Sequence, residues 1–255
     1  MNEKVNILGI DVNCENMNSS IHKIFRKINT SNANYICVTG AHGIVESLKD
    51  KILKNSYENS FLNVPDGMPC VWIGRMQGNR NMKRVYGPDL MINLIKESET
   101  TGHTHFFYGA DENTLKKLKN NLLTKFPKLK IVGCFSPPFR ALKNNEEIDF
   151  KNLISELSPD FMWIGLSCPK QEKYMFEHSF GKPYELNVKM MIGVGAAFDF
   201  HANNIKDAPD WVKNSGLQWL HRLIIEPRRL WKRYFYVVPK FIIFTFLQKM
   251  RLIKF

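Results

Sequence analysis

Short apolar runs alternate with amphipathic stretches along most of the chain. Seven runs have the length and composition of buried strands, and they lie at residues 5–10, 35–40, 61–64, 105–110, 129–134, 160–167 and 189–195. Apolar residues at helical spacing follow them, and the stretch behind the first run carries Met17, Ile21, Ile24, Phe25 and Ile28 on one face. This alternation predicts an α/β fold, with a mostly parallel sheet that carries helices on both faces.

The pattern changes after residue 204. Residues 205–255 show no strand–helix alternation and are typical of several helices, which we expect to be broken at Pro209, Gly216, Pro227 and Pro239. We therefore divide the chain into a sheet domain at 1–204 and a C-terminal helical appendage at 205–255.

Positive charge is concentrated in the appendage. The formal net charge of the chain is +12, and residues 222–255 contain nine Lys or Arg against one acid, so this stretch supplies +8 of it. A basic end predicts an anionic partner, and charge alone leaves both nucleic acid and anionic lipid open. Aromatic and aliphatic bulk follows the basic cluster and no nucleic-acid recognition motif is present, which favours an anionic membrane surface over nucleic acid.

The apolar segment 235–250 is too short to cross a bilayer, and Pro239 and Lys240 interrupt it. It fits a segment lying in the membrane interface with Trp231 as an anchor; packing on the body of the protein or on a partner subunit is the alternative. The start of the chain does not resemble a signal peptide, and the five cysteines are scattered without a C-x-x-C pair. We therefore expect reduced thiols and a cytoplasmic protein, peripheral on the inner face of the cell membrane.

Ligands of a doubly wound sheet bind at the carboxyl ends of its strands, in the loops that open the helices. The candidate loops are residues 39–42, 66–67, 109–111, 167–171 and 193–199. Glycine lets backbone N–H groups approach a phosphate, which makes Gly109 and Gly195 candidate substrate contacts. Asp66 is either the N-cap of the helix that starts near Met68 or a catalytic base, and the two roles are compatible.

The sequence lacks the motifs that are typical of several other enzyme classes. Residues 193–198, GVGAAF, imitate a dinucleotide-binding pattern, but Phe198 replaces its third glycine and no βαβ unit follows. The sequence has no P-loop, no H-E-x-x-H and no D-x-D pair, so a P-loop nucleotidase and a metal site are both disfavoured. If sugar chemistry takes place, arginines of the appendage would have to neutralise the leaving phosphates.

Seven stretches, in this order and spacing, carry a resemblance to a known family. They read VTGAHGIVESLKD, NVPDGMPCVWIGRMQG, KRVYGPDLM, PKLKIVGCFSPPF, PDFMWIGLSCPKQEKYM, MIGVGAAFDFHANNIKDAPDWV and SGLQWLHRLIIEPRRLWKRYF. On these motifs the chain resembles the WecG/TagA/CpsF family of glycosyltransferases over about residues 5–234.

The resemblance implies an enzyme of bacterial surface polysaccharide biosynthesis. Such enzymes transfer a sugar from a UDP-sugar to a sugar linked to undecaprenyl diphosphate, with inversion and without a metal or other cofactor. It also implies a Rossmann-like catalytic domain whose appendage completes the site at the membrane. A non-catalytic, membrane-bound partner protein that retains the fold is the alternative function, and a homo-oligomer stays open.

Several residues match the family's site positions. The resemblance implies Asp66 as the general base, Thr39 and Gln171 as residues of the catalytic loops, and Arg84 as a substrate contact. Asp199 is a further candidate substrate contact, with a turn or cap as its alternative role. The appendage residues implied at or beside the diphosphate are Arg222, Arg229, Lys232 and Arg233.

Two features qualify these assignments. Arg222, Glu226 and Arg229 fall at helical spacing, so an ion-paired helix face is an alternative to an anion site. The first loop commonly reads T-P-N-P in the family, whereas here Ala41 stands at the asparagine position. This departure predicts a donor other than N-acetylmannosamine or a different acceptor sugar.

Overall fold

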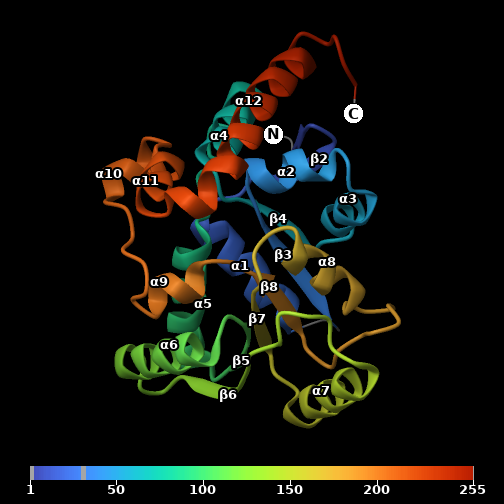
Figure 1. Ribbon diagram of the computed structural model, residues 1–255, viewed down its shortest axis with the longest axis vertical. Helices are drawn as coiled ribbons and strands as arrows, with labels where there is room; N and C mark the ends of the chain where they lie inside the picture. The colour runs from blue at the N-terminus through green and yellow to red at the C-terminus, as the bar shows by residue number, and fades with distance from the viewer. Residues whose placement is uncertain (1–2, 30–32, 255) are drawn as a thin grey trace.

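The computed structural model describes residues 3–29 and 33–254. Six parallel strands form its central sheet in the order β4-β3-β8-β7-β5-β6 (Figure 1). They are β3 (Asn34–Thr39), β4 (Leu62–Pro65), β5 (Thr104–Gly109), β6 (Lys130–Phe135), β7 (Phe161–Gly165) and β8 (Met190–Gly193). The α/β fold predicted from the apolar runs is confirmed, and so are the strands expected at six of the seven runs.

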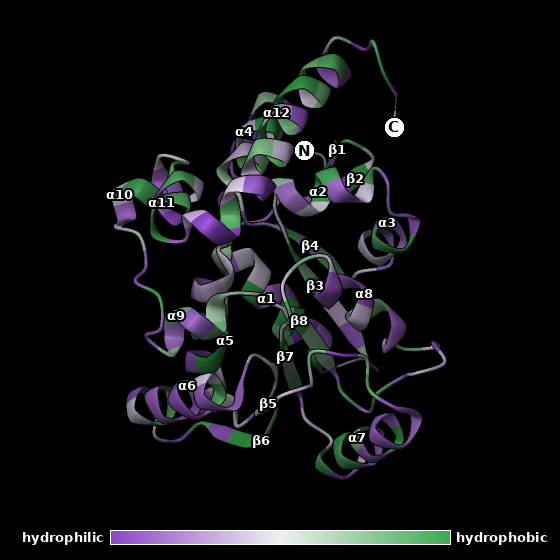
Figure 2. Cartoon of the chain, in the orientation of Figure 1, coloured by the Kyte–Doolittle hydropathy of each residue, from purple (hydrophilic) through white to green (hydrophobic). Residues whose placement is uncertain are grey.

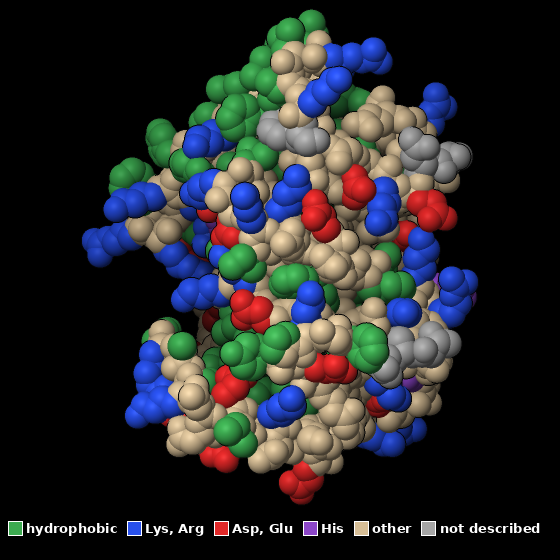
Figure 3. Space-filling view, turned by 90° about the vertical axis from the view of Figure 1, so that its right-hand side faces the viewer, with side chains coloured by type: hydrophobic (Ala, Val, Ile, Leu, Met, Phe, Trp, Pro, Cys, Tyr) green, Lys and Arg blue, Asp and Glu red, His purple; other side chains and the backbone are tan. Residues whose placement is uncertain are grey.

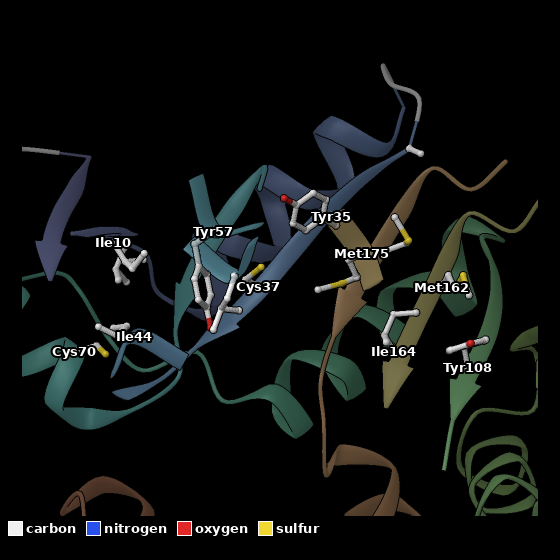
Figure 4. Packing of buried hydrophobic residues seen from close by; sticks show 14 of the residues in the cluster. Ile10, Tyr35, Cys37, Ile44, Tyr57, Cys70, Tyr108, Met162, Ile164 and Met175 are labelled. Carbon is white, nitrogen blue, oxygen red and sulfur yellow. The ribbon is translucent and has the colours of Figure 1, made fainter. Parts of the chain in front are cut away.

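Helices cover both faces of the sheet because side chains alternate along each strand. In β3, Tyr35 and Cys37 join one buried cluster while Ile36 joins the other. The first cluster takes in α2 (Ala41–Ser47), α3 (Lys51–Glu58), α7 (Asn144–Leu157) and α8 (Lys170–Glu177), and Figure 4 shows part of it. The second takes in α1 (Met17–Ile28), α5 (Gly87–Thr101), α6 (Glu112–Lys125) and α9 (Ala197–His201).

The prediction that residues 5–10 form a strand of the main sheet is wrong. This run instead forms most of an antiparallel hairpin of β1 (Lys4–Ile7) and β2 (Ile10–Asn13), with Ile7 opposite Ile10. Leu8 and Gly9 both have positive φ, 51° and 84°, which is the backbone that a two-residue hairpin turn requires. The periodicity of the run cannot reveal this turn, because a leucine rarely adopts such a conformation.

The appendage is helical, as the sequence predicts, but one expected break is absent. Its helices are α10 (Asp210–Asn214), α11 (Gln218–Ile225) and α12 (Pro227–Lys249), so the breaks at Pro209, Gly216 and Pro227 are confirmed. The break at Pro239 is wrong, because α12 runs through it. Val237 and Phe241 are buried on either side of Pro239, and their packing on the body holds both halves of the helix in place.

The appendage packs closely on the sheet domain. Val237 and Phe241 belong to the same buried cluster as the hairpin and α2. They also share it with α4 (Met68–Met76), through Cys70. The division of the chain into two domains at residue 204 therefore stays a prediction, which rests on the change in sequence pattern at that point.

Candidate active site

Two cavities meet at the carboxyl edge of the sheet. The smaller, about 180 Å³, is lined by the ends of β3, β4, β7 and β8 and by α12. The larger, about 540 Å³, lies between α4 and the appendage helices α11 and α12. Both are lined by Gly40, His42, Asp66, Tyr86 and Arg222. The carboxylate of Asp66 therefore lies between two cavities that differ in shape and chemistry.

Asp66 follows the last residue of β4 and is held by its backbone. Its N–H donates to the carbonyl of Thr39 over 3.0 Å, which ties two neighbouring strand ends together. The N-cap of α4 is Gly67, without a side-chain cap, so the capping role considered for Asp66 is wrong. One carboxylate oxygen, Oδ1, is buried without a hydrogen-bond partner and lies 3.5 Å from Arg84 Nη2. The Asp66 carboxylate is thus held in place by its backbone, and it does not cap helix α4.

Arg84 connects Asp66 to the appendage. Its Nε donates to the main-chain carbonyl of Asp66, and its Nη2 donates to Gln218 Oε1. A third, longer bond of 3.4 Å runs from Nη1 to the carbonyl of Lys213. Arg84 lines the larger cavity, but most of its donors serve to join the β4 loop to α10 and α11.

Gln171 lies at the floor of the smaller cavity, in the first turn of α8. Its Oε1 accepts the N–H of Gly195 over 3.0 Å, and its Nε2 donates to Glu172 Oε1 over 3.0 Å. Gly195 has φ of +53°, and its N–H is already bonded to Gln171, so it is not an open donor for a phosphate. Burial raises the pKa of Glu172, which favours the neutral acid behind Gln171.

Three arginines of the appendage face the smaller cavity: Arg222, Arg229 and Arg233. Glu226 pairs with the first two, at 2.9 Å and 2.6 Å, so the helical ion pairs considered as an alternative are present. Arg233 has no ion pair among the described residues. Two carboxylates, those of Glu226 and Asp66, against three guanidinium groups leave a net positive charge, which is suited to a phosphate or diphosphate.

His42 does not add to this charge. Burial and the nearby Arg233 lower the pKa of His42 to about 4, so its imidazole is neutral at neutral pH. The carboxylate at the junction of the two cavities is that of Asp66, and this position makes it the candidate for proton removal there.

Four residues expected at the site do not line either cavity. The Thr39 hydroxyl is fully buried and donates to the carbonyl of Cys37 over 3.1 Å. At Gly109 an added Cβ would lie 2.8 Å from the carbonyl oxygen of Gly165, so this glycine serves close strand packing. Asp199 accepts a bond of 3.4 Å from Asn204, and Lys232 lies over the ring of Trp231.

Some lining residues were not singled out from the sequence. Tyr57 and Cys168 form part of the smaller cavity, and their Oη and Sγ atoms lie 3.9 Å apart. Gln218 lines the larger cavity and has a buried Nε2 without a partner. No sequence signal marks Gln218, because its role depends on the docking of α11 beside Arg84.

The described residues give no indication of a metal centre or a membrane span. Within residues 3–29 and 33–254, no group of three or more His, Cys, Asp or Glu is arranged to hold a metal ion. Over the same ranges, the search for a helix with the length and apolar character of a membrane span finds no candidate.

Comparisons with known proteins identify the family of the chain. The family model described as "Glycosyl transferase WecG/TagA/CpsF family" matches residues 5–254. The chain is 30% identical over 200 residues to a protein of Bacillus subtilis strain 168, covering 76% of this chain and 72% of that protein. It is 25% identical over 233 residues to a protein of Staphylococcus aureus strain MRSA252, covering 90% and 86%. Both relatives are named N-acetylglucosaminyldiphosphoundecaprenol N-acetyl-beta-D-mannosaminyltransferase. Since the family match covers nearly the whole chain, this protein belongs to the WecG/TagA/CpsF family of glycosyl transferases.

Proposed function

We propose that this protein is an inverting hexosyltransferase that moves a sugar from a UDP-sugar to a sugar linked to undecaprenyl diphosphate, in bacterial surface polysaccharide biosynthesis. One observation carries the proposal: a buried oxygen of Asp66 that makes no hydrogen bond lies beside Arg84, where an arginine-lined cavity meets a larger apolar one. A charged donor and an amphiphilic acceptor would reach the same carboxylate from two sides.

In the proposed reaction Asp66 acts as the general base. It takes the proton of the acceptor hydroxyl as that oxygen attacks the anomeric carbon of the donor. The bond from this carbon to the diphosphate oxygen breaks, and UDP leaves with the electron pair. Attack opposite the leaving group inverts the configuration, so an α-linked donor gives a β-linked product.

The appendage arginines would stabilise the leaving diphosphate. Arg222, Arg229 and Arg233 surround the smaller cavity, and guanidinium groups bind phosphate oxygens in a bidentate manner. Fixed positive charge that faces the developing negative charge lowers the barrier without a metal ion. Gln171 would support the site from the floor of the smaller cavity, because its hydrogen bond to Gly195 holds the 193–197 loop against that cavity.

The lipid-linked acceptor is proposed from the names of the relatives and from the exposed surface of the appendage. Large apolar side chains on α12, including Phe235, Ile243 and Phe246, are exposed. Figure 3 shows hydrophobic side chains gathered over the α12 end of the molecule, with Lys and Arg nearby. In Figure 2 hydrophobic and hydrophilic positions are mixed along α12. We propose that this end lies on the anionic inner surface of the cell membrane.

A direct assay tests the function. The purified protein is incubated with a panel of UDP-sugars and an N-acetylglucosaminyl diphosphate lipid, and UDP release and product mass are measured. We expect release with one donor only when acceptor is present, and a β-linkage by NMR. The competing function, a non-catalytic membrane-bound partner, predicts membrane binding without UDP release from any donor.

A further inference from the structure

The larger cavity is an apolar groove with a polar inner end. From Met68 to Met76, helix α4 forms one wall, which at 1.5 Å per residue is about 12 Å long. Helix α12 forms the facing wall. The apolar residues that line the groove include Met68, Trp72, Ile73, Met76, Val238 and Ile242.

The inner end of the groove holds three buried polar atoms that make no hydrogen bond, one of which, Asp66 Oδ1, lies 3.5 Å from Arg84 Nη2. Asp66 Oδ1, Gln218 Nε2 and Arg222 Nε are all buried without a hydrogen bond, and all three residues line this cavity. A buried polar atom without a partner costs free energy, so these atoms indicate a polar occupant. Two of them are donors and one is an acceptor, which suits a group rich in hydroxyl or phosphate oxygens.

The outer part of the groove has the opposite character. Trp72, Met76 and Ile242 expose about half of their surface or more, 45%, 62% and 62%, although the groove brings them together. The cavity volume of about 540 Å³ falls in the range of roughly 300–1,000 Å³ that ligand pockets occupy. An occupant that is polar at one end and apolar along its length would satisfy both parts.

We propose that the groove binds the first isoprenoid units of the lipid-linked acceptor, with its sugar at Asp66. This inference rests on the proposed function and deepens it, because it makes the lipid chain part of what the enzyme recognises. Gln218 is assigned to the acceptor side, donating to an oxygen of the acceptor sugar or its diphosphate. The acceptor reaches the enzyme from the membrane, and the groove binds the part of its isoprenoid chain that has left the bilayer.

Binding measurements test the groove without requiring turnover. N-acetylglucosaminyl diphosphates carrying one to five isoprenoid units are titrated into the protein below their micelle concentration. We expect the affinity to rise with each added unit and then to level off, once the chain extends beyond the groove. An affinity that does not depend on chain length overturns the proposal.

Two neighbouring residues of α12 provide a matched pair of variants. Ile242 lines the groove and Ile243 does not, although both are similarly exposed, 62% and 54%. We expect Ile242→Glu to weaken binding of the longest chain by about tenfold or more, since a carboxylate would have to be desolvated. We expect Ile243→Glu to leave chain-length dependence intact. Equal effects of both substitutions would mean that the groove wall makes no specific contact with the chain, and they overturn the proposal.

Transfer assays separate failure of the groove from failure of the proposed function. Transfer to a water-soluble acceptor with a short alkyl chain and to the undecaprenyl acceptor is measured for wild type, Ile242→Glu and Ile243→Glu. KM for the undecaprenyl acceptor should rise more with Ile242→Glu than with Ile243→Glu, because only Ile242 lines the groove. No transfer to either acceptor contradicts the proposed function, while the binding series still decides the groove. If Ile242→Glu instead converts a dimer to a monomer in light scattering and leaves lipid binding unchanged, a second copy of the chain covers the groove and the proposal fails.

Discussion

The two cavities that meet at Asp66 are built from different parts of the molecule. The smaller one is formed largely by strand ends and loops of the sheet and is completed by three arginines from the appendage. The larger one is formed by helices α4, α11 and α12, and the carboxyl edge of the sheet contributes only its inner end. The carboxyl edge of the sheet thus positions Asp66, the proposed base, and the helices shape the space that the proposed acceptor would enter. The difference suggests that donor and acceptor recognition can be altered independently.

The largest effect should come from removing the charge of the smaller cavity. Arg222→Ala combined with Arg229→Ala removes two of its three guanidinium groups, and we expect kcat/KM for the UDP-sugar to fall by about 10²–10³. Arg228→Ala is the control, because Arg228 is adjacent in sequence but exposed and outside the cavity. Equal losses from the double variant and from Arg228→Ala would show that the cluster acts by general attraction only.

A second prediction concerns the exposed face of α12. Replacing both Phe235 and Phe246 by Glu should reduce binding to anionic vesicles by about tenfold or more in a sedimentation assay, because two large apolar side chains are lost from the contact. Transfer to a water-soluble acceptor should stay unchanged. Phe139→Glu, on an exposed loop after β6, is the matched control and should bind vesicles as wild type does. Unchanged binding by the double variant would place the membrane contact elsewhere.

A third prediction concerns donor choice. Ala41 begins α2 and lies between Gly40 and His42, which line both cavities; the resemblance to the family places an asparagine at this position. In a competitive screen we expect UDP-N-acetylmannosamine not to be the preferred donor. Ala41→Asn should shift the preference toward it by about tenfold or less, the size of effect that one polar contact supplies. Wild-type preference for that donor would remove any role for Ala41 in selection.

The smallest expected effect is on the unfolding free energy, and it concerns Glu172, which lies behind Gln171 at the floor of the smaller cavity. Burial raises the pKa of Glu172 above its usual 4.5, so folding favours the protonated acid. The stability contributed by that acid is present at low pH and is lost as the pH rises through the raised pKa. Glu172→Gln stays neutral and keeps an oxygen for Gln171. Its unfolding free energy should therefore rise relative to that of the wild type as the pH increases from 4 to 8. A difference that is constant with pH would mean that Glu172 is already charged in the fold.

Local periodicity was enough to predict the sheet, because each strand and helix has its own hydrophobic pattern. Asp66 and the arginines were found because their positions combine with strand ends and with the family motifs. Periodicity failed where the backbone is exceptional, as at Leu8 in the hairpin turn, and where tertiary packing overrides a breaker, as at Pro239. Gln218 was missed for a related reason: only the fold brings it beside Arg84.

The most direct test of the account is the effect of Asp66→Asn on transfer and on donor binding, measured separately. Asparagine has nearly the same shape but cannot accept the proton, so transfer to a water-soluble acceptor should fall by about 10² or more. UDP binding, followed by calorimetry, should stay within a few-fold of wild type, because the arginines of the smaller cavity are untouched. Transfer at close to the wild-type rate would contradict the account, since another group would then take the proton.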